Sequence, residues 1–270
     1  MRNIATLQDL TGTWALITGG AGHVGTAAAD TLLELGCNVI LLDRDQTLLE
    51  RALSSLHFAH GKNVFSVQCD LACKQSIHRA VDEVADISSN KLNVLINNAA
   101  FVGTDELKGW AVPFEQQDIN TFDDCLNVNL SAPFLLAQKC IPLFKNTDSP
   151  LKSIVNVSSI YALVGPQMAM YEGTNLGNPA AYAASKAGLM QLTTWLSSVV
   201  APTIRVNNLV LGGIFRNQDS AFLAQYTARV PLARMATEED VKGAFAYLCS
   251  QMSNYMTGQS IVLDGGWTAI

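Results

Sequence analysis

Seven short apolar segments alternate with helix-length segments, and this pattern constrains the fold of the 270-residue chain most strongly. Each apolar segment ends at Gly, Asn, Asp or Ser. They occupy residues 13–18, 38–43, 63–70, 93–99, 153–159, 204–213 and 260–266. The segments between them that have the length of helices cover roughly 24–35, 46–57, 74–86, 121–145, 180–200 and 238–250. Such alternation is typical of a parallel sheet covered by helices on both faces. We therefore predict one α/β domain over residues 1–270, with a doubly wound parallel sheet and functional groups at the carboxyl ends of the strands.

The composition excludes several classes of partner. The net charge is −6 and there is no Lys/Arg-rich run, so we expect neither nucleic acid nor an anionic membrane as a partner. No apolar run reaches the roughly 18 residues that span a bilayer, and the first residues lack an apolar signal core, so we expect a cytoplasmic protein. The six cysteines are scattered, and His57 and His60 have no third ligand at a suitable spacing. We predict reduced thiols and no metal site.

The turn between the first strand and the first helix is rich in glycine. It reads Thr-Gly-Gly-Ala-Gly-His-Val-Gly over residues 18–25, with Gly19, Gly22 and Gly25 three apart. Glycine lets the backbone turn tightly and approach a pyrophosphate, and the helix N-terminus behind it offers free N–H groups. We predict a Rossmann-type dinucleotide site here; a tight turn without a ligand is the alternative.

Polar residues also follow the next three strands. Asp43 can accept both ribose hydroxyls of the adenosine half and would repel a 2′-phosphate, which favours NAD over NADP. Arg44 weakens this preference, because arginine can pair with that phosphate. Asp70 is placed to accept the adenine amino group, and the amides of Asn97 and Asn98 can bond neighbouring strand ends. Ordinary turn chemistry is the alternative for these acids and amides.

A tyrosine and a lysine share one face of the helix predicted at 180–200. Tyr182 and Lys186 are four residues apart in the segment Tyr-Ala-Ala-Ser-Lys. A free tyrosine keeps its proton until about pH 10, and a nearby cation favours the phenolate. The pattern therefore predicts a proton-transfer site with a lowered tyrosine pKa. The alternative is an exposed tyrosine beside a solvated lysine.

Taken in order, these segments resemble the short-chain dehydrogenase/reductase family from about residue 13 to the C-terminus. The resemblance implies that Tyr182 is the general acid/base and that Lys186 activates it and reaches the nicotinamide ribose. It also implies that Ser159 binds the substrate oxygen and that Asn129 positions a water beside the lysine. The segments that carry it are TGGAGHVG, LLD at 41–43, CDL at 69–71, NNAA at 97–100, NVNLSAPF at 127–134, VNVSS at 155–159, YAASK at 182–186, IRVN at 204–207 and LDGG at 263–266.

The resemblance implies a hydride transfer between NAD(H) and a secondary alcohol or ketone, with NADP as the less favoured cofactor. A sugar dehydratase or epimerase with transient hydride transfer and a non-catalytic dinucleotide-binding regulator are the alternatives. The sequence departs from the family at His23, often a glycine, and at Arg216, where a threonine often contacts the cofactor. Arg216 could bind the pyrophosphate or face the substrate. The residues expected to contact the cofactor are Gly19, Gly22, His23, Val24, Gly25, Asp43, Arg44, Asp70, Leu71, Asn98, Ala99, Tyr182, Lys186, Gly212 and Ile214.

Two segments are predicted to cover the substrate pocket. The insert at 161–180 lengthens the family's usual spacing between Ser159 and Tyr182, and resembles that of members that modify flagellin or surface sugars. We therefore expect a polar, sugar-derived small-molecule substrate; a structural cover or subunit contact is the alternative for the insert. The segment at 216–233 is predicted to be a mobile lid. The hydrogen-bonding residues of the insert are Tyr161, Gln167, Tyr171, Glu172, Thr174 and Asn175.

The helices expected at 121–145 and 180–200 carry more apolar residues than one face of a sheet requires. Charged residues also make up only 15% of the chain, below the roughly 25% of ordinary soluble domains. In the family that the chain resembles, the corresponding helices pair into dimers. We therefore predict a homodimer or homotetramer.

Overall fold

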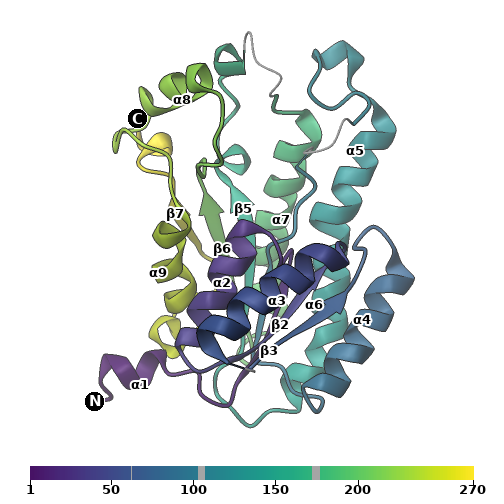
Figure 1. The fold of residues 1–270 in the computed structure, drawn as a ribbon, viewed down its shortest axis with the longest axis vertical. Coiled ribbons are helices and arrows are strands. Elements are labelled where there is room, and N and C mark those ends of the chain that lie inside the picture. Colours follow the sequence, from purple (N-terminus) through teal and green to yellow (C-terminus); the bar gives the residue numbers. More distant parts are fainter. Residues whose placement is uncertain (62, 103–106, 172–176) are drawn as a thin grey trace.

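The computed structural model describes residues 1–61, 63–102, 107–171 and 177–270. In these residues, seven parallel strands form one sheet in the order β3-β2-β1-β4-β5-β6-β7 (Figure 1). Every predicted strand is confirmed, with small differences at the ends. The strands are β1 (Trp14–Thr18), β2 (Asn38–Asp43), β3 (Val64–Gln68), β4 (Val94–Asn97), β5 (Ser153–Ser159), β6 (Arg205–Leu211) and β7 (Ser260–Leu263).

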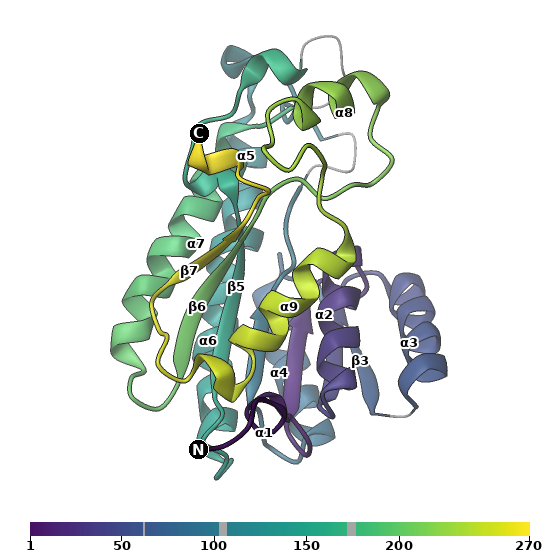
Figure 2. The ribbon, with the colours of Figure 1, turned by 90° about the vertical axis from the view of Figure 1, so that its left-hand side faces the viewer.

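Helices cover both faces of the sheet, which confirms the predicted doubly wound fold. Figure 2 shows α2, α3 and α9 on one side of the sheet and α6 and α7 on the other. A hydrophobic core lies on each face of the sheet, and alternate residues of a strand pack into one core or the other. Ile17 and Leu41 pack into the core that includes α2 and α9, whereas Leu16 and Ile40 pack into the core that includes α4 and α6. The helices are α1 (Ile4–Gln8), α2 (His23–Glu34), α3 (Gln46–His60), α4 (Lys74–Ile87), α5 (Ile119–Leu126), α6 (Ala132–Lys145), α7 (Ala180–Val199), α8 (Ser220–Thr227) and α9 (Glu238–Leu248).

The long helix predicted at 121–145 is divided. A π-helical turn at Asn127–Ser131 separates α5 from α6, and such wide turns often occur at functional sites. The sequence analysis did not predict α1 or α8. The side chain of Asp219 caps α8 by accepting hydrogen bonds from two backbone N–H groups, so an aspartate before an apolar segment was the missed signal.

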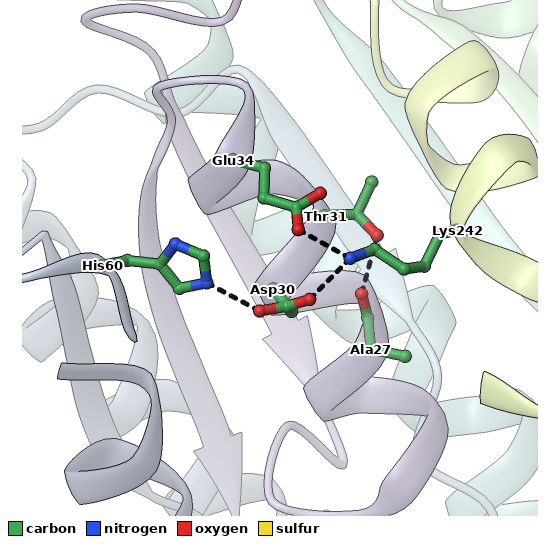
Figure 3. Close-up of polar contacts among 6 residues, drawn as sticks. All are labelled: Ala27, Asp30, Thr31, Glu34, His60 and Lys242. Atoms are coloured by element: carbon green, nitrogen blue, oxygen red, sulfur yellow. Dashed lines mark hydrogen bonds and ion pairs between the residues drawn. The ribbon is translucent and has the colours of Figure 1, made fainter. Parts of the chain in front are cut away.

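An ionic network joins the three helices on the face that carries α2 (Figure 3). Asp30 of α2 lies between His60 of α3 and Lys242 of α9, at 2.6 Å from the His60 Nε2 and 2.6 Å from the Lys242 Nζ. Lys242 also contacts Glu34 at 2.8 Å. This network holds α2 and α9 side by side, so that the first residues of the two helices meet beside the glycine-rich turn.

Further sequence predictions concern the thiols and the two histidines. All six cysteines have free thiols, and Cys73 alone among them is not fully buried. His57 contacts the Val64 carbonyl at 3.0 Å, and His60 belongs to the network with Asp30. In the described parts of the chain, no helix combines the length and the hydropathy needed to cross a membrane.

Candidate active site

The structure brings three predicted catalytic residues together where β5 ends beside α7. Ser159 is the last residue of β5, and its side chain shares a hydrogen bond with the Tyr182 phenol. The Lys186 Nζ donates a hydrogen bond to the Val157 carbonyl at 2.8 Å and lies 5.9 Å from the centre of the Tyr182 ring. The predicted phenol and ammonium therefore share one site, next to a serine hydroxyl.

Burial, more than the neighbouring charge, sets the two pKa values. Burial raises the pKa of Tyr182 to about 12, against the smaller opposing effect of the hydrogen bond with Ser159. Burial also lowers the pKa of Lys186 to about 8, because the residue is only 2% exposed. The prediction of a lowered tyrosine pKa is therefore wrong for this structure, because desolvation of the phenolate is the largest effect on the pKa of Tyr182. At neutral pH the phenol keeps its proton and can donate it.

Buried hydrogen bonds fix the position of α7 on the sheet. The Asn97 amide donates to the side chain of Asn156, and the Asn156 amide donates to the Thr193 hydroxyl of α7, at 2.8 and 2.7 Å. The Thr193 hydroxyl in turn donates to Asn208 of β6 at 2.7 Å. The Ser158 hydroxyl donates to the Lys186 carbonyl at 3.1 Å. α7 is thus held to β4, β5 and β6 in a single register, which places Tyr182 beside Ser159.

Asn129 lies in the π-helical turn and is 1% exposed. Its Oδ1 accepts a hydrogen bond from the Phe101 N–H at 2.6 Å, and its amide donates to the Ser185 hydroxyl at 3.0 Å. Asn129 therefore links the segment after β4 to α7. Its expected role in positioning a water remains a prediction.

The glycine-rich turn has the close contacts that a dinucleotide cradle requires. Gly19 has φ of +61°, and a Cβ at Gly25 would lie 2.1 Å from the Gly19 carbonyl oxygen. Gly22 is the N-cap residue of α2, and a glycine has no side chain that could accept a hydrogen bond from the first N–H groups of the helix. The first N–H groups of α2 thus have no side-chain acceptor from their own cap and are suited to an anion. These features fit a cofactor pyrophosphate.

The other predicted cofactor residues lie at the same edge of the sheet. The Asp43 carboxylate accepts a hydrogen bond from the Ala21 N–H of the glycine-rich turn at 3.3 Å. The Asn98 amide donates to the carbonyls of Thr18 and Gly19 at 3.0 and 3.1 Å, which confirms that it bonds a neighbouring strand end. Asp70 accepts from the Ala72 N–H at 2.9 Å, an ordinary turn contact, and its expected adenine contact remains a prediction.

The remaining predicted cofactor residues follow strand ends or begin α2. Val24 is half-buried in the first turn of α2, Leu71 is buried after β3, and Arg44 is exposed after β2. The Ala99 N–H donates to the Thr18 hydroxyl at 3.0 Å. After β6, the Gly212 N–H donates to the Leu263 carbonyl at 2.8 Å, and Ile214 pairs with Ala236 in a parallel bridge.

The described part of the insert packs against α8. The hydroxyls of Tyr161 and Tyr171 are 2.7 Å apart, and the ring centres of Tyr171 and Phe222 of α8 are 5.8 Å apart. Burial raises the pKa of Tyr161, and a hydrogen bond with Asn178 opposes that shift. Asn178, which the sequence analysis missed, also has a buried Oδ1 without a hydrogen-bond partner among the described residues. Of the predicted insert residues, Glu172, Thr174 and Asn175 lie outside the described residues.

Glu238 is a further charged residue of this region that the sequence analysis missed. It is the first residue of α9. Its Oε1 lies 3.3 Å from the His23 Nδ1 and 2.9 Å from the Arg216 Nη1. The two residues at which the sequence departs from the family pattern therefore meet on one carboxylate. No sequence spacing indicates this contact, because the three residues come from distant parts of the chain.

Known proteins share this sequence pattern and fold. A family profile described as enoyl-(acyl carrier protein) reductase matches residues 19–268. The chain is 30% identical over 252 residues to post-translational flagellin modification protein A of Campylobacter coli, covering 93% of this chain and 96% of that protein. A short chain dehydrogenase from Leptospira borgpetersenii with bound NAD+ has a TM-score of 0.83 at 30% identity, over 99% and 96% of the two chains. An NADPH-dependent 3-quinuclidinone reductase from Rhodotorula rubra has a TM-score of 0.87 at 26% identity, over 100% and 96%.

The buried lysine generates a pH prediction. Its pKa falls from an ordinary 10.5 to about 8 on folding, so between these values the unfolded chain binds more protons and the free energy of unfolding rises with pH. Lys186→Met removes this titration. We expect the variant's stability advantage over wild type to be greatest below the folded-state pKa and to shrink by about 1–3 kcal/mol between about pH 7 and about pH 10.

Urea unfolding followed by circular dichroism at several pH values measures this difference. Lys91→Met is the control, because it makes the same substitution at an exposed lysine. Parallel stability curves for wild type and Lys186→Met would show that the lysine pKa is not lowered by folding.

Proposed function

Because the chain belongs to the short-chain dehydrogenase/reductase family, we propose that it transfers a hydride between a nicotinamide dinucleotide and a secondary alcohol or ketone. The observation that carries this proposal is the grouping of Ser159, Tyr182 and Lys186 at the carboxyl end of β5. Bound nicotinamide would supply or accept the hydride. The grouping also disfavours a binding-only regulator, since that role gives no reason to bury a lysine beside a phenol.

The protein's own residues would bind the substrate oxygen and manage its proton. The Ser159 hydroxyl is positioned to hold that oxygen next to the Tyr182 phenol, with which it already shares a hydrogen bond. In ketone reduction the phenol would donate its proton to the developing alkoxide, a stronger base than a phenolate. The Lys186 ammonium would stabilise the phenolate that remains. In alcohol oxidation the same phenolate would accept the proton.

We propose NAD rather than NADP as the cofactor. The support is Asp43, whose carboxylate lies against the glycine-rich turn and would repel a 2′-phosphate on the adenosine ribose. Arg44 is the opposing feature. The similar structures differ in this respect, since one holds NAD+ and another is described as NADPH-dependent.

We propose a polar, hydroxyl-bearing substrate, which rests on the insert. Tyr161 follows Ser159 by two residues and bonds both Tyr171 and Asn178. Besides burial, Tyr171 also raises the pKa of the Tyr182 phenol. The buried amide oxygen of Asn178 has no partner in the described chain. A buried acceptor without a donor is costly, and a substrate hydroxyl would satisfy it. The similarity to a flagellin modification protein also supports a sugar-derived substrate.

The site can be tested with Tyr182→Phe, which removes the proposed proton donor and keeps the ring. We expect the turnover number to fall about 10²–10⁴-fold for any ketone that the wild type reduces. The assay follows nicotinamide absorbance with a panel of hydroxylated ketones, amino ketones and a 3-oxoacyl thioester. Tyr255→Phe is the matched control, since Tyr255 is fully exposed. Unchanged turnover by Tyr182→Phe would remove this tyrosine from the mechanism.

The cofactor preference can be tested with Asp43→Ala. Loss of the carboxylate removes both the ribose contact and the repulsion of a 2′-phosphate, so the affinity ratio of NADP to NAD should rise about tenfold. Fluorescence titration with both nucleotides measures the ratio. Asp148→Ala, at an exposed aspartate, controls for the change in net charge. A ratio equal to that of the wild type would exclude Asp43 from cofactor discrimination.

We also propose a homodimer or homotetramer formed through α6 and α7. Phe134, Trp195 and Val199 on these helices are about half exposed, at 47%, 53% and 57%. Light scattering should therefore give a dimeric or tetrameric mass, and Trp195→Glu should shift it towards the monomer. Phe58→Glu is the control, because Phe58 is an exposed aromatic residue of α3 on the opposite face. A monomeric wild type would contradict the proposal.

A further inference from the structure

Three polar side chains, from two helices and one loop, meet beside the glycine-rich turn. Glu238 begins α9, His23 begins α2, and Arg216 lies between β6 and α8. One carboxylate oxygen of Glu238 contacts both the His23 ring and the Arg216 guanidinium. Only one side chain therefore separates Arg216 from the first turn of α2, where the pyrophosphate is expected.

The backbone explains why Arg216 and Glu238 meet. The chain after β6 pairs in parallel with the chain before α9: the Phe215 N–H donates to the Ala236 carbonyl at 2.8 Å, and the Ala236 N–H donates to the Gly213 carbonyl at 3.0 Å. This pairing brings the segments that carry Arg216 and Glu238 side by side, and the ion pair closes directly beyond it. The contact is thus built into the fold at the end of β6.

The closest contacts of the Arg216 guanidinium are made by Nη1. Nη1 contacts the Glu238 carboxylate and donates to the Phe215 carbonyl at 2.6 Å. Within the described residues, no hydrogen bond engages Nη2 or Nε. The guanidinium side chain is also three-quarters buried, at 26% exposure. A planar group fixed at one corner leaves its other donors free for an oxyanion.

We propose that Glu238 is a positioning residue for dinucleotide binding: it holds Arg216 at the glycine-rich turn with two nitrogens available to the pyrophosphate. This inference rests on the proposed function only for the identity of the ligand. The Glu238 carboxylate is itself negative and does not attract an anion, so its contribution is geometric. It fixes the long side chain of Arg216, which would otherwise lose conformational freedom when the pyrophosphate binds. The arrangement also favours the pyrophosphate over the substrate as the partner of Arg216.

Glu238→Ala and Glu238→Gln test the proposal, with ADP-ribose and adenosine as probes. ADP-ribose carries the pyrophosphate but no nicotinamide, so its binding does not depend on turnover, and adenosine lacks phosphate. Calorimetry measures ADP-ribose affinity and an NMR titration measures adenosine affinity, both with the full-length protein. Thr237 and Asp240 form the capping box of α9, which both substitutions leave intact.

We expect Glu238→Ala to raise the Kd of ADP-ribose about three- to tenfold and to leave that of adenosine unchanged. Arg216→Ala should raise the Kd of ADP-ribose about tenfold or more, because it removes charge-assisted donors. Glu238→Gln should retain affinity at least in part, since its amide oxygen can still contact Nη1. In the Arg216→Ala background, Glu238→Ala should have no further effect.

Glu239→Gln is the matched control. Glu239 is the next residue of α9, is exposed, and its replacement makes the same change in charge at the same helix end. Its Kd for ADP-ribose should stay within about twofold of wild type.

The proposal is overturned if Glu238→Ala binds ADP-ribose as tightly as wild type or more tightly, or if adenosine affinity falls equally. Wild type that does not bind ADP-ribose would overturn it together with the proposed cofactor site. A finding that Tyr182 does not transfer a proton would leave the proposal about Glu238 standing, because neither ADP-ribose nor adenosine reacts.

Discussion

The buried hydrogen bonds beneath α7 are the constraint on which the rest of the site depends. Asn97, Asn156, Thr193 and Asn208 link the helix to three adjacent strands. Each member is almost fully buried, so a rotation or a slip of α7 would leave amides without partners at a cost of about 1–3 kcal/mol each. The helix therefore has one stable register, and this register alone places Tyr182 over the end of β5.

The same burial that fixes the helix also sets the chemistry. The phenol and the ammonium are both shielded from water, and each is shifted towards its neutral form. The protein thus holds a protonated donor beside a lysine that titrates near neutral pH. In the proposed reaction, charge that develops on a substrate oxygen would appear where water competes weakly, which would strengthen its interactions with the lysine and the serine.

The features of the structure that follow from a local sequence pattern could be predicted. The β-branched runs identified the strands, and the glycine spacing identified a turn in which a Cβ at Gly25 would collide with the Gly19 carbonyl. Features that depend on three-dimensional proximity were not. Glu238 meets Arg216 through a backbone pairing between distant segments, and the direction of the Tyr182 pKa depends on burial that no spacing shows. The π-helical turn around Asn129 was missed because the apolar pattern continues through it.

The insert leaves the sheet at Ser159 and returns just before Tyr182, and both anchor residues are held by β5 and α7 rather than by the insert itself. Its length can therefore change at little cost in chain entropy and without moving the reacting groups. This gives the architecture a modular character. Under the proposed function, exchanging this peripheral loop would change the substrate range and leave Ser159 and Tyr182 in place.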